Sequence, residues 1–134
     1  MIYHHFRSVL KAGVTEAQQA ELLESLRHQG REIAAVKHYL VGREIGGDFD
    51  WGATFVFDDL DGYWSYLMHP AHLRSDEIGL PLVEKFLTYD TTDDPDPEFG
   101  IKVAALHQRR YAELPALARL VRDLPEFTGS GLEG

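Results

Sequence analysis

Three side chains that can bind or move a proton lie close together around a proline, in the stretch SYLMHPAHLRS at residues 65–75. Histidine can take a proton from the carbon next to a carbonyl, because its ordinary pKa of about 6.5 lies near neutrality. A tyrosine hydroxyl can hydrogen-bond the carbonyl oxygen or orient the histidine ring. Tyr66 and His72 therefore form a candidate acid/base pair. Each also has a structural interpretation, with Tyr66 as a core aromatic and His72 as a polar residue at a helix start.

The proline decides how these side chains are presented. Pro70 ends the helix predicted for residues 58–68, because the residue before a proline resists the helical conformation. Proline is favoured at the first position of a helix, so a second helix is expected from Pro70 onwards. His72 then lies in a first turn, where the helix dipole disfavours the imidazolium and keeps the ring neutral. His69 is expected to hold the break, while Tyr63 and Trp64 are expected to pack. The break and the lack of a third ligand predict no metal site.

The elements that must position this stretch follow from hydrophobic periodicity. The strand IYHHFRSVL places His4 on one face with Ile2, Phe6, Ser8 and Leu10, and it places His5 on the other face. The predicted elements are a strand at 2–10, a helix from the capping box at 15–18 to near Gly30, strands at 33–42 and 49–57, two helices separated at Pro70, and a strand around 86–89. This β-α-β-β-α-β order predicts an α+β fold of the ferredoxin-like type.

An apolar cavity is expected between the sheet and the first helix, although a filled core would give the same pattern. It would take a hydrophobic or aromatic small molecule. The residues predicted to line it are Phe6, Leu22, Leu23, Leu26, Trp51, Ala53 and Phe55, with a polar contact from Tyr39.

Composition limits the classes of partner. The chain has 134 residues, a formal net charge of −9 and no cysteine. The acidic balance predicts no nucleic-acid partner and no anionic membrane surface. No signal peptide or membrane-spanning run is visible, so a soluble cytoplasmic protein is expected. Residues 1–91 are predicted to form one domain, followed by an acidic linker at 92–100 and a helical C-terminal extension at 101–134.

The extension is expected to contain two amphipathic helices that pack on a homodimer of the protein. The first would present Ile101, Ala104, Ala105 and Gln108 on one face. The second would begin at Pro115 and present an apolar stripe of Leu117, Leu120, Val121 and Leu124. The residues from Pro125 onwards are expected to be frayed. Both faces of the predicted sheet are partly apolar, so pairing of two sheets in a homodimer is expected.

The sequence resembles the stress-responsive dimeric A/B barrel (Dabb) family. The resemblance covers residues 1–91 and rests on YHHFRSVLKAGVTEAQ, VKHYLVGREI, ATFVFDD and above all YLMHPAH. It implies a protomer whose sheet pairs with a second copy to form a dimeric α+β barrel. Within the family, the chain is similar to the polyketide cyclases of the olivetolic acid cyclase type, which need no cofactor. That similarity implies Tyr66 and His72 as catalytic residues and His4 as a pocket histidine. Those cyclases carry a further histidine on the third strand, where this chain has Trp51.

Three functions are compatible with this pattern. The leading hypothesis is a cofactor-free acid/base enzyme, cyclase- or lyase-like, that acts on a hydrophobic carbonyl or aromatic compound. A cofactor-free monooxygenase of the dimeric barrel type is the second. A non-enzymatic, stress-related ligand-binding dimer is the third, in which the histidines only shape the helix break.

Overall fold

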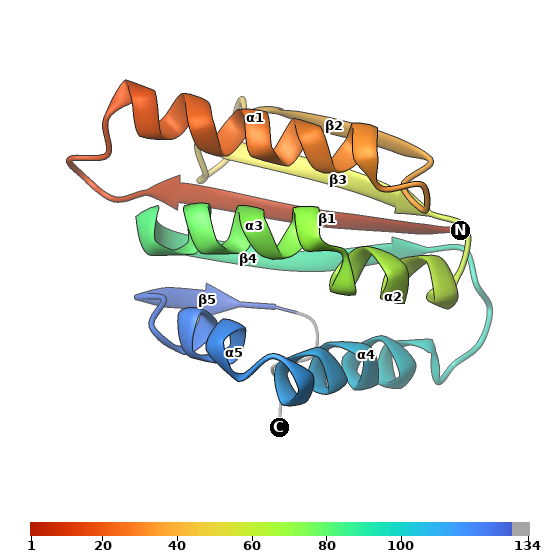
Figure 1. The fold of residues 1–134 in the computed structure, drawn as a ribbon. Helices are drawn as coiled ribbons and strands as arrows, with labels where there is room; N and C mark the ends of the chain where they lie inside the picture. The colour runs from red at the N-terminus through yellow and green to blue at the C-terminus, as the bar shows by residue number, and fades with distance from the viewer. Residues whose placement is uncertain (130–134) are drawn as a thin grey trace.

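The molecule consists of one sheet with its helices packed along one side (Figure 1). The computed structural model describes residues 1–129. The elements, in chain order, are β1 (Ile2–Leu10), α1 (Glu16–Glu32), β2 (His38–Arg43), β3 (Trp51–Phe57), α2 (Leu60–Met68), α3 (Pro70–Gly79), the short 3₁₀ helix η1 (Leu80–Leu82), β4 (Val83–Thr92), α4 (Phe99–Glu113), α5 (Pro115–Arg122) and β5 (Glu126–Thr128). The sheet order is β2-β3-β1-β4-β5. The predicted β-α-β-β-α-β ferredoxin-like fold is confirmed.

Strand β1 lies at the centre and holds the register of its neighbours. It pairs antiparallel with β3 on one side and with β4 on the other. His4 faces Phe55 across the first ladder and Asp90 across the second. The side chains of Ile2, His4 and Ser8 are buried, so this face of β1 is the one covered by the helices.

The start and end of α1 illustrate what local signals can and cannot predict. The Thr15 side chain accepts from the Gln18 backbone, and the Gln18 side chain accepts from the Thr15 backbone, which confirms the capping box. Helix α1 ends at Glu32, near Gly30 as predicted, but Gly30 lies inside the helix rather than just after it. Gly30 is needed for space instead: a Cβ there would lie 2.3 Å from the Tyr39 ring. The second strand also begins later than predicted, at His38.

The break between α2 and α3 matches the prediction. Pro70 occupies the first turn of α3. The His69 backbone is extended, and its Nδ1 accepts a hydrogen bond of 3.1 Å from the Ala71 backbone. His69 therefore caps α3, as expected for the residue that holds the break.

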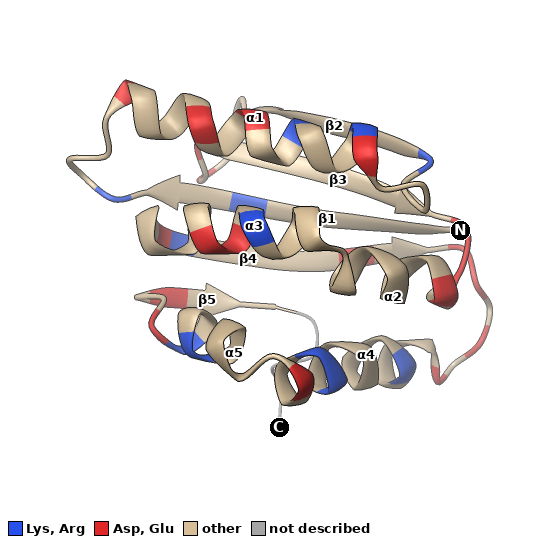
Figure 2. Cartoon of the chain, in the orientation of Figure 1, with Lys and Arg blue, Asp and Glu red and all other residues tan. Residues whose placement is uncertain are grey.

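The C-terminal part of the chain extends both the sheet and the layer of helices. An acidic segment links β4 to α4, and Lys and Arg residues lie on α4 (Figure 2). Helix α4 packs on α2, and α5 packs on α3. Strand β5 pairs in parallel with β4. The predicted fraying is therefore wrong for Glu126–Thr128, where backbone pairing with β4 overrides a weak local signal; residues 130–134 lie outside the described part.

The buried face of α4 also differs from the prediction. Ile101 is 70% exposed, whereas the buried residues are Phe99, Val103, His107 and Arg110. The apolar stripe predicted from Pro115 onwards is found: Leu117 and Val121 of α5 and Leu124 just after it are buried, and Leu120 packs against them. Two polar side chains of α4 thus point into the protein, and their position bears directly on the site.

Candidate active site

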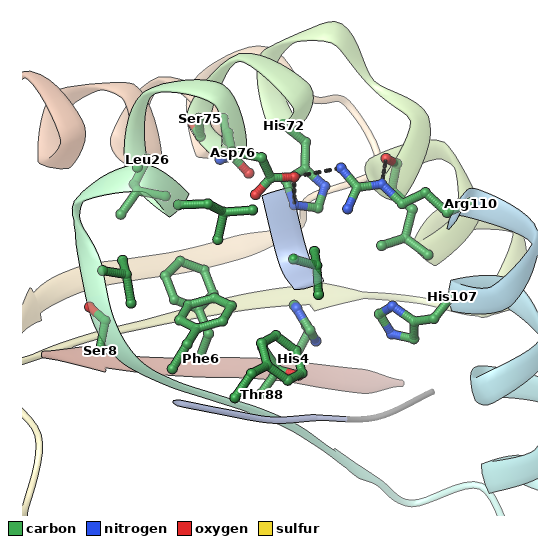
Figure 3. Close-up of a pocket in the computed structure, with 18 of the residues that line it drawn as sticks. His4, Phe6, Ser8, Leu26, His72, Ser75, Asp76, Thr88, His107 and Arg110 are labelled. Atoms are coloured by element: carbon green, nitrogen blue, oxygen red, sulfur yellow. Dashed lines mark hydrogen bonds and ion pairs between the residues drawn. The ribbon is translucent and has the colours of Figure 1, made fainter. Parts of the chain in front are cut away.

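A cavity of about 80 Å³ lies between the helix-facing side of the sheet and the helices (Figure 3). Six of the predicted site residues line it: His4, Phe6, Leu22, Leu26, Tyr66 and His72. The structure places the other five elsewhere. Leu23 and Trp51 line a neighbouring recess of about 10 Å³. Ala53 and Phe55 are buried in the core, and Tyr39 is 40% exposed.

His72 is held by backbone and by ring stacking. Its Nδ1 lies 3.2 Å from the backbone oxygen of Tyr66, which can only accept, so Nδ1 carries the proton and Nε2 is the proton acceptor of the neutral ring. The Tyr66 ring stacks on it with centroids 4.2 Å apart. Burial lowers the pKa of His72 well below its usual value, and the charge of Arg110 adds to the decrease. The ring is therefore neutral at neutral pH, as expected, and burial is the largest cause.

Asp76 connects His72 to the C-terminal extension. Its Oδ2 lies 3.5 Å from Nε2 of His72 and accepts a hydrogen bond of 2.7 Å from Nη2 of Arg110. Arg110 also donates from Nε to the backbone oxygen of Leu67, at 2.6 Å. Burial raises the pKa of Asp76, and the neighbouring guanidinium works against that rise. Figure 3 shows the dashed lines that join Asp76 to the imidazole of His72 and to the guanidinium of Arg110.

A second polar group surrounds His4. Nδ1 of His4 donates to Oδ1 of Asp90 at 2.8 Å. The Tyr63 hydroxyl donates to Asp90 at 3.0 Å, and its oxygen lies 2.9 Å from Nε2 of His107. Burial raises the pKa of Tyr63 well above its usual value. Burial, helped by His4, lowers the pKa of His107 to about 4. Tyr63 is a neutral hydroxyl that joins three elements of the site.

Sequence reasoning missed five of these polar residues: Tyr63, Asp76, Asp90, His107 and Arg110. Tyr63 does pack in the core as predicted, but its hydroxyl also belongs to the site. A signal existed for Asp76, which is four residues after His72 and so shares its helix face. A weaker signal existed on α4, where His107 and Arg110 follow Val103 at helical spacing. Asp90 gave no local signal, because its contact with His4 depends on strand register.

Within residues 1–129, no group of three or more His, Asp or Glu side chains is arranged to hold a metal ion. In the same range, no helix has both the length and the apolar composition needed to cross a bilayer. Three histidines line the cavity, and two of them, His4 and His72, are held through Nδ1 by an oxygen atom.

Comparison with known families identifies the class of protein. The model of the stress responsive A/B barrel (Dabb) domain matches residues 2–93, so the chain belongs to this family. No curated protein matches the sequence.

Three solved structures illustrate the range of similar proteins. A Dabb family protein with a ferredoxin-like fold from Mesorhizobium loti is 27% identical, with a TM-score of 0.61, over 69% of this chain and 96% of its own. A dimeric ferredoxin-like protein of unknown function from Thermobifida fusca is 23% identical, with a TM-score of 0.62, over 68% of this chain and 89% of its own. The hydroxynitrile lyase from Passiflora edulis is 13% identical, with a TM-score of 0.63, over 71% of this chain and 94% of its own. The last two share the fold alone with this chain.

Proposed function

We propose that the protein is a cofactor-free acid/base enzyme, lyase- or cyclase-like, that moves a proton next to the carbonyl group of a small hydrophobic compound. The observation that carries the proposal is that His72, Tyr66 and His4 line one cavity although they come from α3, α2 and β1. In this proposal Nε2 of His72 takes the proton, and Tyr66 orients the His72 ring and donates a hydrogen bond to the substrate. His4, fixed by Asp90, is the second group able to exchange a proton.

The neutrality of His72 supports its role as a base. A base must be unprotonated to act, and the lowered pKa of His72 keeps the ring in that form at neutral pH. The raised pKa of Tyr66, caused mainly by burial, keeps its hydroxyl protonated and able to donate. The pair therefore has the protonation states that proton abstraction next to a carbonyl requires.

The size and lining of the cavity support a small apolar substrate. Its volume of about 80 Å³ is well below the roughly 300–1,000 Å³ typical of drug-sized ligand sites. Its apolar wall includes the side chains of Phe6, Leu22, Leu26, Phe86 and Phe127. We expect a substrate with few heavy atoms beyond its carbonyl group. The hydroxynitrile lyase with the same fold is an example of a lyase built on this architecture.

The open face of the sheet supports the proposal of a homodimer. Tyr3, Leu40 and Tyr89 are large exposed side chains of β1, β2 and β4. His5 pairs with Tyr89 across strands, so it lies on the same face as Tyr89, opposite His4. A second copy pairing through this face would bury these side chains. The T. fusca protein, which has the same fold, is described as dimeric.

The test is a screen for product formed without oxygen. Purified protein is incubated with small aldehydes, ketones, β-hydroxy ketones and hydroxynitriles, and product is followed by NMR while an oxygen electrode records consumption. The proposal expects carbon–carbon bond formation or cleavage without oxygen uptake, lost in His72→Ala. Oxygen uptake would favour the monooxygenase alternative, for which the aromatic wall of the cavity is the supporting observation. Ligand binding without turnover, unchanged in His72→Ala, would favour a binding protein.

A further inference from the structure

Arg110 has more hydrogen-bonding capacity than its structural contacts use. Its side chain is buried, with the residue only 5% exposed, and Nε and Nη2 donate to Leu67 and Asp76. Within residues 1–129, these are the hydrogen bonds that Arg110 makes, so none involves the third nitrogen, Nη1. The polar side-chain atoms that are fully buried without a partner in this range are those of Gln29. Nη1 therefore borders space that a water-sized molecule can reach.

That space is the cavity. Arg110 lines it together with His72, His4 and His107. In Figure 3 two guanidinium nitrogens of Arg110 carry the dashed lines to Asp76 and to the backbone, and the third points into the cavity, towards the side where His4 and His107 lie. The site therefore presents a fixed cation, with two N–H groups, to whatever occupies the cavity.

We propose that Arg110 is a catalytic residue that binds the carbonyl oxygen of the substrate and stabilises the negative charge that develops there. This rests on the proposed function and names its substrate class: a neutral, enolisable carbonyl compound. In the step, the C–H bond next to the carbonyl breaks and its proton passes to Nε2 of His72. The C–H electron pair forms the carbon–carbon double bond, and the carbonyl π pair moves to oxygen. The resulting oxyanion accepts hydrogen bonds from Nη1 of Arg110.

The charges around the cavity favour a neutral substrate over an anionic one. Asp76 already pairs with Arg110, and Asp90 lies beside His4 and Tyr63. A substrate carboxylate would add a third negative charge facing these two. Proton transfer within the site changes no total charge, because the oxyanion and the imidazolium of His72 form together. A donor that is already fixed by two hydrogen bonds needs no reorganisation when the charge appears.

Arg110 lies outside the part of the chain that matches the family. The family match ends at residue 93, and Arg110 belongs to α4, in the C-terminal extension. The extension therefore brings the cation to a cavity whose histidines and Tyr66 come from the matched domain. A purely structural Arg110 would tie α4 to α2 and α3 and would have no effect on ligands.

The test uses acetate, a planar isostere of the acetone enolate, and acetamide, its neutral isostere. Binding to the full-length protein is followed by the ring ¹⁵N shifts of His4, His72 and His107. Acetate mimics the oxyanion state only together with a protonated His72, so we expect saturable acetate binding with uptake of one proton, tighter than acetamide binding and weakened at least about tenfold in Arg110→Met. Arg109→Met is the matched control, because Arg109 is more than half exposed and lies over the Trp64 ring. It should bind acetate like the wild type.

A second variant guards against loss of folding. Arg110→Met leaves Asp76 buried without its partner, so Arg110→Met/Asp76→Asn removes the uncompensated carboxylate and should also bind acetate poorly. Wild-type protein that does not bind acetate, or Arg110 variants that bind it as well as the wild type, would overturn the inference. If acetate does not bind but turnover still depends on His72, only the role of Arg110 is overturned. If acetate binding depends on Arg110 but no turnover is found, the proposed function is overturned and the oxyanion subsite stands.

Discussion

Arg110 of α4 donates a hydrogen bond of 2.7 Å to Asp76 of α3, across 34 positions of sequence. The bond joins the C-terminal extension to the Dabb domain at the cavity itself. Asp76 in turn lies 3.5 Å from Nε2 of His72, so one carboxylate faces both the candidate base and the cation. The extension is therefore a wall of the site.

Breaking this pair should lower stability. Arg110→Met leaves a buried carboxylate unpaired, and such changes cost about 3 kcal/mol in the free energy of unfolding. Urea denaturation measures the change, with Arg109→Met expected within about 0.5 kcal/mol of the wild type. Asp76→Asn combined with Arg110→Met should be less destabilised than the sum of the two single variants. Additive single and double variants would mean that the two side chains do not interact.

Acid should destabilise the protein through His107. Its pKa is about 4 in the folded protein and 6.5 by reference, so the unfolded chain binds more protons between these values. Its contribution to stability is present above pH 6.5 and is lost as the pH falls towards 4. From pH 7 to pH 5 this amounts to about 2 kcal/mol. The lowered pKa of His72 acts in the same direction.

The variant His107→Gln isolates this contribution. Urea denaturation measures how much the free energy of unfolding falls between pH 7 and pH 5. This fall should be about 2 kcal/mol smaller in His107→Gln than in the wild type. His28→Gln, an exposed position on α1, should keep the wild-type loss. Equal losses in His107→Gln and the wild type would show that His107 is not held neutral by the fold.

Gln29 should be replaceable with a gain in stability. Its amide nitrogen and oxygen are buried without a partner, on a residue that is 0% exposed. An unsatisfied buried amide costs about 1–3 kcal/mol, so Gln29→Met, of similar shape, should raise the free energy of unfolding by about 1 kcal/mol or more. Thermal and urea denaturation test this against Gln108→Met, at an exposed position of α4. A destabilised Gln29→Met would mean that the amide has a partner in solution.

The open sheet face should mediate self-association. Light scattering should give a mass of two 15.2 kDa chains for the wild type. Leu40→Glu places a charge on this face, whereas Ile101→Glu places one on α4, and the two native side chains are 71% and 70% exposed. Leu40→Glu should weaken the dimer and Ile101→Glu should not. Dimers of unchanged strength in both variants would place the interface elsewhere.

The parts of the fold with strong local signals were predictable. The capping box at Thr15 and the break at Pro70 depend on residues within a few positions, and both lie where the sequence indicated. The role of Gly30 inside α1 was not predictable, because it depends on the Tyr39 ring from a neighbouring strand, which a Cβ would meet. Strand β5 was missed for a similar reason, since its partner is β4.

The residues of the candidate site also differ in how far local sequence could predict them. Tyr66, His72 and His4 were found from residue type, strand alternation and family resemblance. The partners that fix them depend on tertiary structure: Asp90 reaches His4 through the β1–β4 register, and Arg110 reaches Asp76 only after α4 has packed on α2. In the sequence, a buried polar residue on an otherwise apolar helix face only interrupts the hydrophobic pattern. The structure shows that such an interruption on α4 supplies two lining residues of the cavity.

The most direct test of the account is exchange of the methyl protons of acetone in D₂O, followed by ¹H NMR with catalytic amounts of protein. The account predicts exchange faster than in buffer, reduced at least about 100-fold in His72→Gln and unchanged in His28→Gln. Exchange no faster than in buffer, or equal exchange by the wild type and His72→Gln, would contradict the claim that this cavity performs acid/base chemistry through His72.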